Sequence, residues 1–114
     1  MSSTTPLLSQ YDLHELEIWA RDNNIYTRLV KLTPELRGFV TTSSYGSHLI
    51  AIDKNITLEM QQETLLHEIN HIINHFPKLP YIIGLDMQHT TIEDDPDKFL
   101  EIIAESGGDI KGYF

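Results

Sequence analysis

One short run of residues carries the clearest chemistry in this sequence. His67 and Glu68 are followed by His71 in the pattern HExxH, and His75 stands four residues further on. Residues four apart lie one turn apart on the same face of a helix, so the imidazoles of His67 and His71 can converge on one Zn²⁺. Glu68 could then take a proton from the metal-activated water as it attacks a carbonyl. The pattern predicts metal-assisted hydrolysis.

The segment that holds the motif must be a helix for this chemistry to work. Thr57 is a suitable N-cap, and Pro77 is expected to end the segment. The apolar residues between them follow a helical period and would turn the histidine-bearing face toward the edge of the core; they are Leu58, Leu65, Leu66, Ile69, Ile72, Ile73 and Phe76.

The roles of the remaining histidines stay open at this point. His75 lies one further turn along the same face, but three turns of a straight helix diverge from one metal ion, so a supporting or helix-capping role is favoured over ligation. His89 could be a ligand or could donate a hydrogen bond to the transition state, although a single histidine in a loop is more often exposed to solvent. Tyr45, Tyr81 and His48 could each supply such a hydrogen bond.

The other predicted elements place this helix within an α+β domain. A first helix is expected to begin at a capping box formed by Ser9 and Asp12 and to run to about Arg21. Residues 25–32 are predicted to be a short strand, and residues 38–42 and 47–52 a hairpin around a four-residue turn. Residues 81–85 are expected to be a loop packed on the core, and residues 94–105 a last helix ending at two glycines. The order predicts three helices packed on a small antiparallel sheet.

Length and composition suggest one acidic, soluble domain. The chain has 114 residues, expected to form a single domain over 1–114 with residues 1–8 flexible. Asp and Glu number 17 against 8 Lys and Arg, a net charge of −9, which disfavours direct binding to nucleic acid or to anionic membranes. The absence of cysteine excludes disulfides and thiol chemistry. Neither a membrane span nor a signal peptide is evident, so a cytoplasmic location is expected.

Residues 64–75 resemble the zinc helix of the ImmA/IrrE family of metallopeptidases. The preceding hairpin, residues 36–40 and 49–52, is similar too, and Glu59, Gln61, Gln62 and Glu63 match the family's Glu/Gln-rich helix start. The resemblance covers about residues 36–104 and implies a zincin-like minimal metallopeptidase domain.

In that family an acidic residue on the following helix is the third zinc ligand. The family pattern is Glu-Ala, two residues, then Phe-Ala, and aligning the phenylalanine places Asp95 at the ligand position. Asp is one methylene shorter than Glu, and Pro96 replaces the alanine. If Pro96 is the first helical residue, Asp95 could instead be its N-cap. Glu93 is then the next candidate ligand.

The resemblance implies a zinc-dependent endopeptidase that uses His67, His71 and Asp95 as ligands and Glu68 as general base. The family's substrates are commonly helix-turn-helix repressors encoded nearby on a phage or mobile element, and an acidic surface would suit such a basic partner. The alternative is a catalytically weak binding module that acts as an antirepressor or inhibitor of a protein partner. Residues 47–52 would be either the edge strand that pairs with an extended substrate or a strand in the middle of the sheet.

Overall fold

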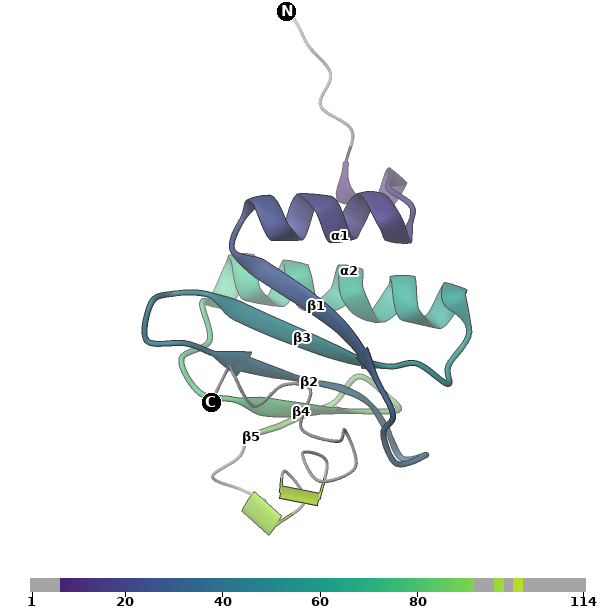
Figure 1. The fold of residues 1–114 in the computed structure, drawn as a ribbon, viewed down its shortest axis with the longest axis vertical. Helices are drawn as coiled ribbons and strands as arrows, with labels where there is room; N and C mark the ends of the chain where they lie inside the picture. The colour runs from purple at the N-terminus through teal and green to yellow at the C-terminus, as the bar shows by residue number, and fades with distance from the viewer. Residues whose placement is uncertain (1–6, 92–95, 98–99, 102–114) are drawn as a thin grey trace, which may run out of the picture.

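The described strands pair into one mixed sheet, and two α-helices of the described residues pack against it, so the fold class is α+β (Figure 1). The computed structural model describes residues 7–91, 96–97 and 100–101. Within those residues the elements are η1 (Leu8–Gln10), α1 (Leu13–Asp22), β1 (Ile25–Val30), β2 (Leu36–Thr42), β3 (His48–Asp53), α2 (Leu58–His75), β4 (Tyr81–Gly84) and β5 (His89–Thr91). The described part of the sheet has five strands in the order β1-β3-β2-β4-β5.

The prediction of a wholly antiparallel sheet is wrong for one pair, because β1 runs parallel to β3. The chain reverses direction once between β1 and β2 and again at the β2–β3 turn, so β3 regains the direction of β1 and fits between the two earlier strands. This central position also overturns the hypothesis that residues 47–52 form an edge strand for substrate. Both sides of β3 are already paired, with β1 and with β2.

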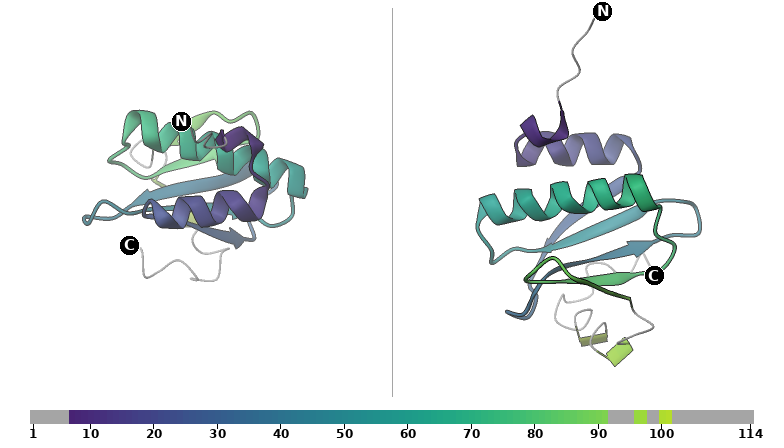
Figure 2. Two further views of the ribbon diagram at one scale, coloured as in Figure 1. Left: turned by 90° about the horizontal axis from the view of Figure 1, so that it is seen from above. Right: turned by 180° about the vertical axis from the view of Figure 1, so that it is seen from behind.

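Both helices share one core with the sheet. Leu16 and Ala20 of α1 and Leu65, Ile69 and Ile72 of α2 pack into a cluster with buried residues of β1, β2, β3 and β4. Figure 2 shows α2 lying across the sheet with α1 beside it. A second cluster of buried apolar residues, which includes Phe39, Leu49 and Ile82, belongs to the strands and their connections alone.

Local signals determine where the two helices begin and end. The α1 N-cap is Asp12, which forms a capping box with Glu15, so the predicted capping role of Ser9 is wrong. For α2 the prediction is confirmed: the Thr57 side chain accepts from the Met60 amide, and the helix ends at His75, with Phe76 as a left-handed C-cap just before Pro77.

Residues 81–85 were expected to form a loop, but most of them form β4. This strand pairs antiparallel with β2 and continues through a tight turn into β5, which pairs with β4. The turn has a positive φ of 63° at Met87. Although β5 has only three residues, its pairing holds His89 opposite Ile83.

The expected last helix falls mostly outside the described residues. Pro96–Asp97 and 100–101 have helical backbone, while Glu93 and Asp95 are not among the residues that the structure describes. Within the described chain, neither helix has the length and apolar character that crossing a membrane requires.

Candidate metal centre

The HExxH motif lies in the middle of α2, at the border between its buried and exposed faces. Glu68 is on the buried stripe with Leu65, Ile69 and Ile72 and has no exposed surface. The neighbouring His67 side chain is 43% exposed. The helix therefore directs a carboxylate into the core and leaves an imidazole beside it at the surface.

The buried carboxylate of Glu68 has a hydrogen-bond partner on each oxygen. The Tyr81 hydroxyl donates to Oε1 at 2.7 Å, and the Nε2 of His89 lies 3.0 Å from Oε2. Tyr81 comes from β4 and His89 from β5, so the β4–β5 hairpin supplies both partners. Burial, and then the charge and hydrogen bond of Glu68, raise the pKa of Tyr81 far above its ordinary value. Tyr81 therefore remains a hydrogen-bond donor.

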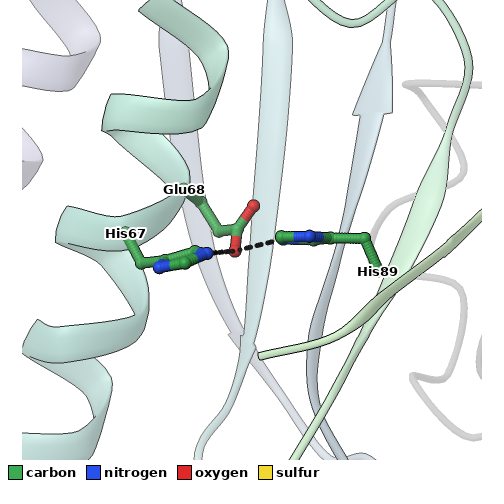
Figure 3. A group of neighbouring side chains, drawn as sticks. All are labelled: His67, Glu68 and His89. Atoms are coloured by element: carbon green, nitrogen blue, oxygen red, sulfur yellow. Dashed lines mark hydrogen bonds and ion pairs between the residues drawn. The ribbon is translucent and has the colours of Figure 1, made fainter. Parts of the chain in front are cut away.

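Imidazole rings surround this carboxylate. Figure 3 shows the Glu68 carboxylate between His67 and His89, and the Nε2 of His67 is 3.8 Å from Oε2. The ring of His89 stacks on that of His71 with centroids 4.7 Å apart, and the ring of His67 is 5.4 Å from that of His89. Burial lowers the pKa of His71, and the neighbouring His89 lowers it further. The neutral, ligating form of His71 is thus favoured.

Three of these side chains form a group that could hold a metal ion. One donor atom from each of His67, Glu68 and His89 lies within 4.8 Å of the other two. Imidazole nitrogens and a carboxylate oxygen suit zinc and several other divalent ions. The donor set therefore fits a metal ion in its chemistry and in its spacing.

The structure brings together some of the predicted site residues and leaves others apart. His67 and Glu68 lie in the compact group, while His71 contacts it through the stacked ring of His89. The predicted third ligands, Asp95 and Glu93, lie outside the described residues.

His89 is the residue that the sequence analysis left open, and it belongs to the group through β5. The signal that could have found it is weak: two β-branched residues, Thr90 and Thr91, after a turn rich in polar side chains. Its side chain is only 24% exposed, so the expectation of a solvent-exposed loop histidine is wrong.

The other candidates for a transition-state hydrogen bond lie elsewhere. Tyr45 is 94% exposed in the turn between β2 and β3. His48, at the start of β3, has a buried Nδ1 without a hydrogen-bond partner among the described residues, and burial lowers its pKa. Of the two tyrosines first considered, Tyr81 alone contacts Glu68.

Comparison with known proteins adds no further constraint. No family model, no curated protein and no solved structure matches this chain. The function must therefore be argued from the chemistry and geometry of the His67, Glu68 and His89 group and of the HExxH helix that carries it.

Proposed function

We propose that this chain is a zinc-dependent peptidase of zincin-like type, related to the ImmA/IrrE group that its zinc helix resembles. His67, His71 and His89 would hold the ion, and Glu68 would be the general base. The observation that carries the proposal is the wholly buried Glu68 carboxylate, which lies among imidazoles on the HExxH helix. Burying a carboxylate is costly to the fold unless hydrogen bonds replace its lost water, and here the side chains of Tyr81 and His89 supply them.

A bound zinc ion would supply Lewis acidity for a water nucleophile and for the scissile carbonyl. The side chains of the chain supply the rest. Tyr81 fixes Oε1 of Glu68, which leaves Oε2 facing His67 and His89 as the oxygen that would take a proton from the attacking water. For Nε2 of His89 to hold the ion it must present a lone pair, so in the loaded site its hydrogen would lie on Nδ1 and the contact with Oε2 would be given up.

The substrate class follows from the family resemblance and from charge. A net charge of −9 favours a basic protein partner, and a DNA-binding repressor is the partner that the resemblance implies. In this proposal His89 takes the place that the family resemblance gave to Asp95, with Glu93 as the next candidate. Asp95 and Glu93, which lie outside the described residues, remain the alternatives to His89 as the third ligand.

One specific observation favours the alternative, a zincin-like binding module with little hydrolytic activity. Both oxygens of Glu68 are engaged and the residue has no exposed surface, so a water and a substrate could reach it only after a rearrangement. Such a protein would occupy a repressor or another partner without cutting it.

The first test is the zinc content of protein purified without a metal-affinity tag, measured by mass spectrometry for wild type, His71→Ala and His89→Ala. The proposal expects about one tightly bound zinc per wild-type chain, loss of that zinc in His89→Ala, and weaker binding in His71→Ala, where the compact group of His67, Glu68 and His89 remains. His14→Ala changes an exposed histidine of α1 and is the matched control. A wild-type chain that binds no zinc, even when zinc is offered, would overturn the peptidase proposal.

The second test asks whether Glu68 acts as a general base or as a zinc ligand. Glu68→Gln is nearly isosteric and should retain zinc while abolishing cleavage of a fluorescein-labelled casein or a basic peptide library. Loss of zinc from this variant would make Glu68 a ligand instead of a base. Full zinc occupancy with no cleavage by the wild type, together with unchanged partner binding by the variant, would support the binding module.

A further inference from the structure

A third imidazole of α2 is not used by the proposed centre. His75 follows His71 by one turn, and their ring centroids lie 4.7 Å apart at an interplanar angle of 40°. Two histidines separated by one helical turn are well placed to share a transition-metal ion.

A hydrogen bond determines which nitrogen of His75 is available. Its Nδ1 lies 3.2 Å from the backbone carbonyl oxygen of His71. A carbonyl oxygen can only accept, so Nδ1 carries the hydrogen and the neutral ring keeps its lone pair on Nε2. Metal-ligating histidines commonly have this arrangement, in which one ring N–H is bound to a carbonyl and the opposite nitrogen holds the ion.

The surface above this pair has room for an ion and its water ligands. His67, Asn70, His71, Asn74 and His75 line a shallow depression that is open to solvent. His75 is exposed, and the two asparagines flank the imidazoles along the same helix. An ion bound there would keep most of its coordination sphere as water.

We propose that His71 and His75 form a second, weaker site for a late first-row divalent ion such as Zn²⁺, Ni²⁺ or Cu²⁺. Two neutral imidazoles favour these ions over Mg²⁺ or Ca²⁺, which prefer oxygen ligands. The second site would share His71 with the first centre, and the His71 ring also stacks on that of His89.

The second site has a consequence for the first, and this consequence rests on the proposed function. His71 would be drawn to the second ion, and the compact group of His67, Glu68 and His89 could keep the first ion without it. Glu68 would then be a ligand and could no longer accept the proton of the attacking water. A chain loaded with two ions would therefore lose its peptidase activity.

The test is a calorimetric titration of the metal-free full chain with zinc chloride alone. The wild type is expected to bind two ions in two steps, and His75→Gln should bind one, with the affinity of the first step retained. Glutamine keeps helix propensity and removes the imidazole at an exposed position. His14→Gln, on the exposed face of α1, is the control and should retain both steps. Far-UV circular dichroism of each variant confirms that the helices remain folded.

Either of two results would overturn the second site: a single binding step in the wild type, or two unchanged steps in His75→Gln. The effect of zinc on peptidase activity is tested separately from zinc binding. If the chain is a peptidase, cleavage should fall as the second equivalent binds to the wild type but persist through it in His75→Gln. Two binding steps with no cleavage at any zinc concentration would remove the proposed peptidase and leave the second site standing.

Discussion

Glu68 lies in the core, where an unpartnered carboxylate would be strongly destabilising. Moving a charge out of water costs several kcal/mol in a real protein unless hydrogen bonds compensate it. Here, with the Nε2 of His67 3.8 Å away, the hydrogen bonds among the described residues come from two side chains, Tyr81 and His89. The stability of the domain should therefore be unusually sensitive to each of them.

Tyr81→Phe tests this sensitivity by removing one hydroxyl. The ring still fills its place in the core, while Oε1 of Glu68 loses its donor. An unsatisfied buried partner costs about 1–3 kcal/mol, and a charged one costs more, so the free energy of unfolding should fall by at least that amount. Urea denaturation measures it. Tyr45→Phe, at a 94% exposed tyrosine, is the control and should change stability by less than about 0.5 kcal/mol. Equal effects of the two variants would show that the Tyr81 hydroxyl does not support Glu68.

His48 gives a prediction for pH dependence at the residue scale. Burial lowers the pKa of His48 below the ordinary value of a histidine, so the unfolded chain binds a proton before the folded chain does as pH falls. The stabilisation that His48 contributes is therefore lost progressively below about pH 6.5. The loss is complete once the pH lies below the pKa of His48 in the folded chain. Urea midpoints of wild type and His48→Gln, compared at pH 7.5 and 5.5, should show a smaller acid loss in the variant. Parallel acid losses in the two proteins would contradict this role.

At the scale of elements, the site depends on close pairing of β2 with its neighbours. A Cβ on Gly38 would overlap the carbonyl oxygen of Ala51 on β3, and a register shift already lies between Leu36 and Gly38 in the pairing with β4. Gly38→Ala should therefore force the strands apart and cost about 1–3 kcal/mol or more, as overpacking does. Chemical denaturation measures the loss, and amide exchange of β4 should show whether the hairpin that carries Tyr81 and His89 loosens.

Gly84→Ala is the matched control for that substitution. Its added Cβ would meet the side chain of Asp86 at 3.3 Å, and such a side chain can move aside. Its effect should be clearly smaller than that of Gly38→Ala. A Gly38→Ala protein as stable as the wild type would mean that β2 and β3 tolerate a wider spacing than the structure indicates.

The sequence predicts one half of the site better than the other, for a physical reason. Helix α2 has a cap, a helical period and a proline stop, all local signals, so His67 and Glu68 could be placed before the fold was known. Strand order depends on contacts between distant residues. The parallel pairing of β1 with β3 has no local signature. β5 has too few residues to show alternation, and this is why the position of His89 could not be predicted.

At the scale of the whole molecule, the candidate site joins parts of the fold that are distant in the sequence. α2 contributes His67 and Glu68, while the β4–β5 hairpin contributes Tyr81 and His89 at the opposite end of the sheet order from β1. A metal ion bound between His67 and His89 would act as a crosslink between the helix layer and one side of the sheet. Such a crosslink exists in the folded chain alone. The free energy of metal binding therefore adds to the free energy of unfolding.

Zinc should therefore raise the stability of the folded chain by an amount set by its affinity. The His75→Gln variant retains only the first of the two proposed metal sites. In this variant, free zinc at 100 times its dissociation constant should raise the free energy of unfolding by about 2.7 kcal/mol. Thermal unfolding with and without a chelator measures the shift, and adding His14→Ala should leave it intact. Adding His67→Ala or His89→Ala should abolish it. A shift that survives in the His89→Ala chain would mean that the ion is bound by α2 alone, and the hairpin would then have no part in holding the metal.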